Sequence, residues 1–351
     1  MIRIAIAGVG NCCSALIQGL YHYGRVGDPL GLLHEAIGRY RASDIQVVAA
    51  FDIDRRKVGR DLSEAVFASP NIVPRMVDLP YMGVTVLRGP ILDGCGPLTK
   101  DLVEVDELEG YSNIPQELRR CEADILINLI SGGAEQASRY YAEAALEAGC
   151  AFINATPAEI ACDDSWAQRF KTAGLPLVGD DLLDQVGATV VHMGILEFLN
   201  RRGAHIDESY QLDVGGGLES LDTLGRTREL KRRVKTEAVS SSISYEFPLV
   251  SGSTDYVDFL EDKRESFLWV KGRYFSGAEF TMDIKMTTRD APNAGAVLMD
   301  VIRATKLALD RGVGGVVTPI SAYGFKRSPR RYPLSEAHRL FERFIEELSG
   351  D

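Results

Sequence analysis

The chain has few cysteines and histidines for its length, and neither residue shows a metal-binding arrangement. Six cysteines and five histidines are spread over 351 residues, and no Cys-x-x-Cys pair occurs. Structural zinc sites depend on such closely spaced ligands, so we expect no metal ligand set and reduced thiols. A catalytic Cys–His pair stays an alternative, although nothing around any cysteine indicates an activated thiolate.

Long hydrophobic runs and excess positive charge are also missing. No apolar run reaches the ~20 residues that cross a bilayer, and the N-terminus enters a strand pattern without signal-peptide features. We therefore expect a cytoplasmic protein with no membrane partner. Lysine and arginine number 39 against 50 acidic residues, a net charge of −11. Such a surface repels nucleic acid, so we expect no nucleic-acid partner.

What the chain does contain is the pattern of an α/β fold. It is 45% hydrophobic and 25% charged, which is typical of a globular protein of about two domains at ~150 residues each. In the first half, short apolar runs alternate with helical stretches, which predicts βαβ units on a doubly wound parallel sheet. Expected strands are 2–7, 45–51, 125–130, 151–154 and 175–178, and expected helices are 11–23, 135–148 and 164–173.

A different pattern begins after an expected helix at about 185–200. Alternating polar and apolar residues predict a half-exposed, largely antiparallel sheet in an α+β second domain. The segments concerned are 205–214, 241–247, 268–274 and 279–286, followed by a helix at 294–310, a loop carrying Pro319 and Pro329, and a terminal helix at 335–348.

A glycine turn after the first strand predicts a dinucleotide site. Gly8-Val9-Gly10-Asn11-Cys12-Cys13 is an incomplete G-x-G-x-x-G, with Cys13 at the third glycine position. Gly8 permits the tight turn, and Gly10 lets the backbone approach a pyrophosphate at the helix N-terminus. We assign Gly8, Gly10, Asn11 and Cys12 to cofactor binding; the alternative is a plain strand–helix turn.

An acidic residue at the end of the second strand favours NAD as the cofactor. Asp52 stands where a carboxylate accepts hydrogen bonds from the ribose hydroxyls of NAD and repels the 2′-phosphate of NADP. Its alternative role is to cap the next element. Arg55 and Arg56 follow at once and leave NADP open as an alternative.

The densest basic stretch of this acidic chain is residues 225–235. On a helix, Arg228, Lys231, Arg232 and Lys235 fall at i, i+3, i+4 and i+7 and share one face. Four like charges on one stripe repel one another, which indicates an anionic partner such as a phosphate or an enolate. A solvated helix face is the alternative.

Several longer motifs resemble the inositol-1-phosphate synthases, in particular their bacterial and archaeal branch. They are Gly8–Cys12, 50–54, 88–94, 141–149, 179–181, 185–189 and 309–315. The resemblance implies a Rossmann-type NAD-binding domain over 1–200, a catalytic and oligomerisation domain over 201–293, and a C-terminal segment, 294–351, that returns to the first domain. It also implies a homotetramer.

The resemblance also implies the reaction and its residues. In that family, NAD takes a hydride from C5 of a hexose 6-phosphate, C6 becomes an enolate that attacks the sugar's own carbonyl, and the hydride returns. Lysines stabilise the oxyanions. The matching catalytic positions here are Lys231, Lys235, Lys326, Asp181, Asp290 and Arg264, the last in place of a lysine. Asp180 is assigned to the cofactor, with helix capping as its alternative.

The departures from the family pattern lie close to these residues. Leu183 and Asp184 replace Lys and Ser, Glu219 replaces Asp, and Ala291 replaces Ser. Lost side chains near the acceptor carbonyl favour a substrate with an extra exocyclic carbon, so we prefer fructose 6-phosphate giving a five-membered cyclitol phosphate. The alternative is glucose 6-phosphate giving inositol 3-phosphate. A plain NAD dehydrogenase and a non-catalytic NAD-binding protein remain as other classes.

Overall fold

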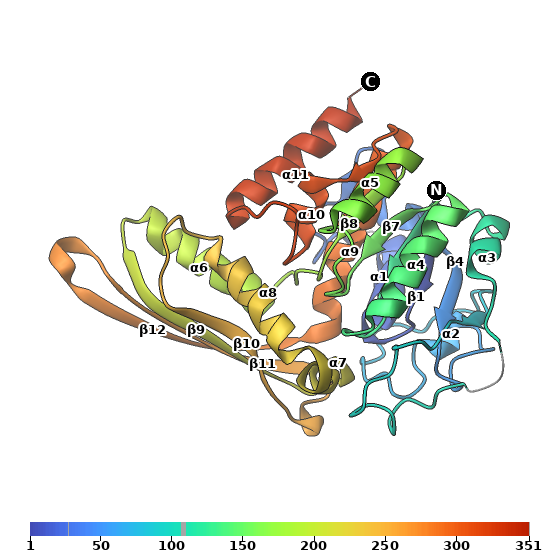
Figure 1. The fold of residues 1–351 in the computed structure, drawn as a ribbon, viewed down its shortest axis with the longest axis horizontal. Helices are drawn as coiled ribbons and strands as arrows, with labels where there is room; N and C mark the ends of the chain where they lie inside the picture. Colours follow the sequence, from blue (N-terminus) through green and yellow to red (C-terminus); the bar gives the residue numbers. More distant parts are fainter. Residues whose placement is uncertain (27, 107–109, 351) are drawn as a thin grey trace.

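A seven-stranded parallel sheet forms the larger half of the molecule (Figure 1). The computed structural model describes residues 1–26, 28–106 and 110–350. The strand order is β13-β8-β7-β6-β1-β4-β5, and every pairing within it is parallel. The strands are β1 (Ile2–Ala7), β4 (Ile45–Asp52), β5 (Val86–Arg88), β6 (Ile125–Asn128), β7 (Ala151–Asn154), β8 (Pro176–Gly179) and β13 (Gly315–Val316).

Both faces of this sheet are buried under helices. In β1, Ile2, Ile4 and Ile6 point to a core shared with α1, α9 and α11, whereas Ala5 and Ala7 point to a core shared with α3, α4 and α5. Alternate residues of a strand face opposite sides, so apolar residues at consecutive positions are what two covered faces require. The helices are α1 (Asn11–Val26), α2 (Leu62–Ala65), α3 (Ile114–Arg120), α4 (Glu135–Ala148), α5 (Asp164–Ala173), α9 (Asp290–Asp310), α10 (Thr318–Gly324) and α11 (Leu334–Ser349).

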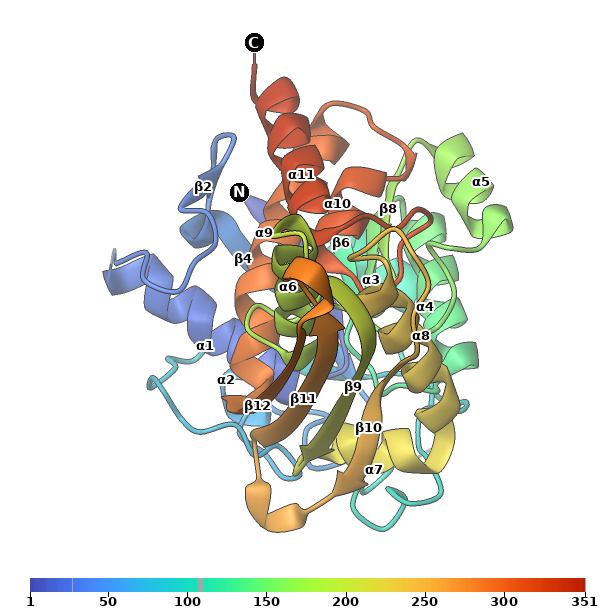
Figure 2. The same ribbon diagram turned by 90° about the vertical axis from the view of Figure 1, so that its left-hand side faces the viewer.

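A second sheet extends to one side of the first. Its order is β10-β9-β11-β12, from β9 (His205–Gly215), β10 (Leu249–Tyr256), β11 (Lys263–Arg273) and β12 (Glu279–Arg289). Helices α6 (Ala188–Arg201) and α8 (Arg228–Ser240) lie over one face (Figure 1), and Figure 2 shows the curved strands β12, β11, β9 and β10 side by side. Between β9 and α8 the chain forms α7 (Leu218–Asp222) and a π-helix, η2 (Thr223–Thr227).

The remaining regular elements are small. A two-stranded hairpin joins β2 (Ala36–Ile37) to β3 (Tyr40–Arg41). Single 3-10 turns occur at η1 (Ala42–Asp44), η3 (Asp258–Leu260) and η4 (Phe275–Gly277). The C-terminal segment contributes β13 and three helices to the larger half, so the chain leaves that half for the second sheet and then returns. The boundaries at 200/201 and 293/294 stay a prediction.

The fold class is confirmed, but two local predictions are wrong. Residues 241–247 are not a strand: Ser241 ends α8, and the next strand begins only after Pro248. Alternation in a serine-rich run did not distinguish a strand from a loop whose Ile243 packs into the core. The prediction of a largely antiparallel sheet is confirmed by the pairings of β11 with β9 and β12, and the α7–α8 crossover makes β10 parallel to β9. Pro319, which was predicted to lie in a loop, lies in the first turn of α10.

Candidate active site

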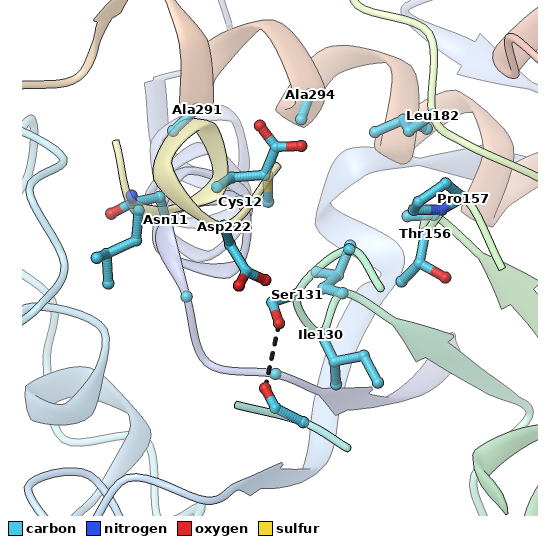
Figure 3. Close-up of a pocket in the computed structure, with 18 of the residues that line it drawn as sticks. Asn11, Cys12, Ile130, Ser131, Thr156, Pro157, Leu182, Asp222, Ala291 and Ala294 are labelled. Atoms are coloured by element: carbon cyan, nitrogen blue, oxygen red, sulfur yellow. Dashed lines mark hydrogen bonds between the residues drawn. The ribbon is translucent and has the colours of Figure 1, made fainter. Parts of the chain in front are cut away.

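A cavity of about 310 Å³ lies where the parallel strands end and the second sheet begins. In open α/β sheets, ligands bind outside the carboxyl ends of the strands. Figure 3 shows residues from these separate elements facing one space, including Asn11 and Cys12, Ser131, Thr156 and Asp222. Eleven of the twelve candidate residues line it: Gly8, Gly10, Asn11, Cys12, Asp52, Asp181, Lys231, Lys235, Arg264, Asp290 and Lys326.

The glycine turn borders the cavity in the geometry that a dinucleotide requires. Gly8 has φ +93°, and a Cβ there would lie 2.7 Å from the backbone of Leu129, so only glycine fits. At Gly10 a Cβ would meet nothing within 4 Å, so space is left beside the backbone. Helix α1 begins at Asn11, and its N-terminal amides offer an anion site.

Val9 holds this turn in place through both of its backbone groups. Its amide donates to Asp52 Oδ2 at 2.7 Å. Its carbonyl accepts hydrogen bonds from Lys57 Nζ at 2.9 Å and Asn71 Nδ2 at 3.0 Å. Asp52 Oδ1 also accepts from the amides of Ile53 and Asp54, both at 2.8 Å. Asp52 therefore has the capping role and also lines the cavity, whereas its contact with a ribose stays a prediction.

The two arginines that left NADP open are already engaged. Arg56 donates to both carboxylate oxygens of Asp54, from Nε at 2.9 Å and from Nη2 at 2.5 Å. Arg55 Nε donates to Glu104 Oε2 at 2.6 Å. Because both guanidinium groups have carboxylate partners, neither is placed to receive a 2′-phosphate without breaking an ion pair.

The basic stripe of α8 divides into an inward and an outward half. Lys231 and Lys235 are buried, with 8% and 4% of their surface exposed, whereas Arg228 and Arg232 are exposed to solvent. The anionic partners of the buried pair are protein carboxylates. Lys231 Nζ donates to Asp181 Oδ1 at 3.0 Å and lies 3.2 Å from Glu219 Oε1.

Ion pairing keeps Lys231, Asp181 and Asp213 charged. Burial lowers the pKa of Lys231, but Asp181 and Glu219 outweigh it and raise that pKa above its ordinary value. Burial raises the pKa of Asp181, and here Lys231 and Lys326 outweigh it and lower it. Lys235 Nζ donates to Asp213 Oδ2 at 2.6 Å, and this ammonium lowers the pKa of Asp213 against the effect of burial.

Asp181 is the centre of this arrangement. Its φ of +58° is left-handed, a strained conformation for a residue other than glycine. Its amide donates to the Thr156 carbonyl at 2.9 Å, and its carbonyl accepts from the Lys326 amide at 2.7 Å. Lys326 Nζ donates to the Leu182 carbonyl at 2.5 Å and lies 3.8 Å from Asp181 Oδ1. The backbone thus holds one carboxylate between two ammonium groups.

Arg264 forms the opposite side of the cavity. Its Nη2 donates to Asp290 Oδ2 at 2.5 Å and lies 3.4 Å from Glu219 Oε2. Burial opposes its charge, yet Asp290 and Glu219 raise the pKa of Arg264 well above its ordinary value. The guanidinium is therefore a fixed cation and a poor proton donor.

Three buried polar atoms of this cavity have no hydrogen-bond partner among the described residues: Asp181 Oδ2, Asp262 Oδ2 and Arg264 Nε. Unsatisfied buried groups are costly, and two acceptors and one donor suit a ligand rich in hydroxyl and phosphate oxygens. These three unpaired atoms therefore favour a polar substrate in the cavity.

Asp180 is the one candidate residue outside the cavity lining. Its carboxylate is fully buried, where it accepts from Asn154 Nδ2 at 2.7 Å and from the amides of Ile160, Ala161 and Cys162 at 3.0–3.2 Å. Burial raises its pKa to about 6. It does not cap α6, whose N-cap is Gly187; it organises the loop after β7, and its cofactor role stays a prediction that its place outside the lining disfavours.

The two cysteines of the glycine turn are not activated nucleophiles. Burial raises the pKa of Cys12 to about 12 and raises that of Cys13 as well. Cys13 belongs to the core between α1 and β1, where the third glycine of the motif would pack. Both thiols therefore stay protonated at neutral pH.

Two acidic residues of the site, Asp213 and Asp262, are not predicted from the sequence. Neither was a candidate site residue. Asp213 lies under Lys235, and Asp262 lies beside the start of α9. For Asp213 a signal existed, because Ser209, Gln211 and Asp213 alternate along β9 and put three polar groups on the buried face. Asp262 gave no local signal: its Oδ1 accepts from the Ala291 amide at 3.2 Å, a contact made only by the fold.

Comparison with known proteins decides the family. A family model described as myo-inositol-1-phosphate synthase matches residues 187–291. An inositol-3-phosphate synthase of Corynebacterium glutamicum is 41% identical over 98% of this chain and 98% of its own. The chain belongs to the inositol-phosphate synthase family. It is therefore an enzyme of the intramolecular isomerase type.

Solved structures agree with this family membership. A protein titled Ari2 is 31% identical, with a TM-score of 0.77 over 98% of this chain and 99% of its own. A myo-inositol-1-phosphate synthase-related protein of Thermotoga maritima has the same fold, with a TM-score of 0.79 at 23% identity over 99% of this chain and 98% of its own.

The structure locates the departures from the inositol-phosphate synthase pattern. Asp184, Glu219, Arg264 and Ala291 all line the cavity, whereas Leu183 is buried outside the lining. The lysine missing at position 183 is thus replaced by a side chain that does not face the cavity. Within the described ranges, no group of three or more His, Cys, Asp or Glu is arranged to hold a metal ion, and no helix there has the length and hydropathy to span a bilayer.

Proposed function

We propose that the protein uses NAD to cyclise glucose 6-phosphate to inositol 3-phosphate without net oxidation. The observation that carries the proposal is the convergence of Lys231, Lys235, Lys326 and Arg264 on one cavity beside the glycine turn. Relatives named inositol-3-phosphate synthase, at 40–41% identity over 98% of the chain, support this six-membered product. They favour it over the five-membered product that we preferred from the sequence.

The residues around the glycine turn fit NAD as the cofactor. Gly10 leaves room for a pyrophosphate at the start of α1, and Asp52 offers a carboxylate to ribose hydroxyls. The engagement of Arg55 and Arg56 by Glu104 and Asp54 disfavours NADP. When bound, NAD would accept the hydride from C5 of the sugar and return it after ring closure.

The lysines would stabilise the oxyanions of the reaction. Asp181 raises the pKa of Lys231 and lies beside both Lys231 and Lys326, so both side chains are placed to donate to oxygens on which negative charge develops. Such preorganised donors need no rearrangement during the reaction. The buried lining would also keep water away from the enolate. Water could otherwise protonate the enolate carbon before the ring closes.

Arg264 would bind the phosphate of the substrate. Its Nη2 is held by Asp290 and Glu219, and its Nε has no hydrogen-bond partner in the described part of the chain. A guanidinium fork suits a phosphate oxygen better than a point charge does. Lysine in other members of the family and arginine here would supply the same charge with different geometry.

The open face of the second sheet would bind further copies of the chain, giving a homotetramer. Tyr210 and Leu212 on β9 and Phe267 on β11 are 37–38% exposed on that face, and Tyr210 stacks on Trp269 at 5.5 Å. Apolar side chains gathered on one sheet face are typical of an interface, and soluble assemblies of one chain are usually symmetric.

The deciding experiment offers NAD with glucose 6-phosphate or fructose 6-phosphate to the purified protein and identifies the products by NMR and mass spectrometry. We expect a six-membered ring of unchanged mass from glucose 6-phosphate. A five-membered cyclitol phosphate from fructose 6-phosphate alone would overturn the choice of substrate. Reduced cofactor accumulating in step with substrate loss would instead indicate a dehydrogenase. The Lys231→Met variant serves as the inactive control.

A further inference from the structure

Arg226 joins three separate segments beside the cavity. Its Nη1 donates to the Asp93 carbonyl at 2.6 Å, and its Nη2 donates to Ser131 Oγ at 2.8 Å. Its Nε donates to Asp222 Oδ1 at 2.9 Å, and its Nη2 also contacts Asp222 Oδ2. Asp93 follows β5 and Ser131 follows β6 in the larger half, whereas Arg226 and Asp222 belong to the segment between β9 and α8 of the second sheet.

The packing around Arg226 is close. A Cβ at Gly96 would lie 2.7 Å from Arg226 Nε and 2.1 Å from Asp222 Oδ1. A Cβ at Gly133 would lie 3.2 Å from Arg226 Cβ, and φ there is +85°. Two glycines therefore let the loops of the larger half approach this ion pair.

The ion pair is buried and borders the cavity. Asp222 is 2% exposed, and the side chain of Arg226 is 13% exposed. Asp222, Ser131, Gly94 and Thr99 all line the cavity. In Figure 3 the Asp222 carboxylate points toward Ser131, whose hydroxyl donates to the Gly94 carbonyl at 3.2 Å. An exposed ion pair contributes little, whereas a buried one with several hydrogen bonds constrains its partners.

Arg226 is also linked to α8, the helix that carries Lys231 and Lys235 and is called the catalytic helix below. The π-helix that carries it runs directly into α8, where Lys231 follows five residues later. A shift of the loops after β5 and β6 would therefore move the start of the helix that carries two lysines. Single π-helical turns occur frequently at functional sites.

We propose that Arg226 is a positioning residue that fastens the cofactor-side loops to the catalytic helix, so that the reduced cofactor stays bound between the two hydride transfers. This inference rests on the proposed function. Loss of cofactor after the first transfer would leave the sugar as a ketone, because no hydride would return. Sugar and NAD would then give a keto-sugar phosphate, NADH and a proton, and no ring would be completed.

The test compares Arg226→Gln with Arg226→Lys, Ser131→Ala and the matched control Arg233→Gln, which alters an exposed arginine of α8. NAD affinity is measured by calorimetry, and NADH and cyclitol phosphate are measured in the same reaction. We expect Arg226→Gln to weaken NAD binding about tenfold, the loss of one or two charge-assisted hydrogen bonds. We also expect it to release NADH and a keto-sugar phosphate in equal amounts, and Arg226→Lys to restore the coupling only in part.

Wild-type NAD affinity together with no NADH release in Arg226→Gln would overturn the proposal, as would equal NADH release by Arg233→Gln. If Arg226→Gln fails to fold, Ser131→Ala decides, because it removes a single contact of the guanidinium. It should weaken NAD binding in the same direction by a smaller factor, and unchanged binding would count against the proposal. If the wild-type chain cyclises neither sugar, the proposed function fails, whereas the comparison of NAD affinities still tests the role of Arg226.

Discussion

Lys231 donates a hydrogen bond to Asp181 at 3.0 Å across fifty positions of the chain. Lys231 lies on α8 over the second sheet, and Asp181 follows β8 of the first. This contact therefore joins the two halves of the molecule at the site of the proposed chemistry. Asp181 is 2% exposed there, and the ammonium group of Lys326 lies nearby.

Removing Lys231 should abolish most activity. Lys231→Met deletes one preorganised donor, so we expect kcat to fall about 10²–10³-fold. The free energy of unfolding should fall by about 3–5 kcal/mol, because Asp181 is left buried with one partner fewer. The double variant Lys231→Met, Asp181→Asn should regain stability but not activity. Arg232→Gln, on the exposed side of the same helix, is the control for both measurements.

The arginine at position 264 should act through its charge and not through proton transfer. Arg264→Lys keeps a cation beside Asp290 and Glu219, so we expect kcat/KM to fall by less than about tenfold, whereas Arg264→Met should lower it by about 10²-fold or more. Steady-state kinetics with the sugar phosphate varied would measure both. Equal losses in the two variants would mean that the fork geometry, and not the charge, is what matters.

Asp52 should make the enzyme select NAD. We expect NAD to bind at least about tenfold more tightly than NADP, a difference of ~1.4 kcal/mol, because the carboxylate repels a 2′-phosphate. Asp52→Asn removes the charge and leaves an acceptor for the Val9 amide, so the ratio should narrow. Calorimetric titration with each dinucleotide would show this, and an unchanged ratio would assign the selectivity to other residues.

A histidine remote from the cavity should make stability depend on pH. His34 Nδ1 lies 2.5 Å from Asp300 Oδ2, its Nε2 lies 2.7 Å from Glu342 Oε1, and the hydrogen bond to Asp300 raises its pKa above the ordinary value. A raised pKa stabilises the folded chain below pH ~6.5, the value when unfolded. That stabilisation is lost as the pH rises through the higher pKa of the folded state.

Denaturation at a series of pH values would measure this dependence. At pH 6, His34→Gln should lower the free energy of unfolding by about 1.5–3 kcal/mol, and it should flatten the profile above that pH. His22→Gln, which alters a half-buried histidine of α1, is the control and should keep the wild-type profile. A profile with the same slope in His34→Gln would show that another group is responsible.

The open face of the second sheet should govern assembly. Phe267→Glu places a carboxylate beside Lys285, whose Nζ lies 5.5 Å from the Phe267 ring, so the single chain should tolerate it. A charge inside an apolar interface is costly, and we expect light scattering to show a smaller assembly. Tyr81→Glu changes an aromatic side chain that is 81% exposed on the larger half, and it should leave the mass unchanged.

Local sequence patterns determined the elements that depend on near neighbours. The first strand, the glycine turn and the helix beginning at Asn11 follow from apolar periodicity and from backbone freedom at Gly8, and the structure places them there. The motifs that resemble the inositol-1-phosphate synthases identified Lys231, Lys235 and Lys326 as candidates. Such motifs are matched by residue types at fixed spacing along the chain. These features require no knowledge of distant contacts.

Only the tertiary structure decided which charges meet. Periodicity put four basic residues of α8 on one face, but contact with Asp181 and Asp213 turned two of them inward and left Arg228 and Arg232 in solvent. Asp180 and Asp181 are adjacent, yet one organises a buried loop and the other faces the cavity. The physical reason is that burial and pairing energies depend on groups brought together from distant segments, and local sequence does not specify them.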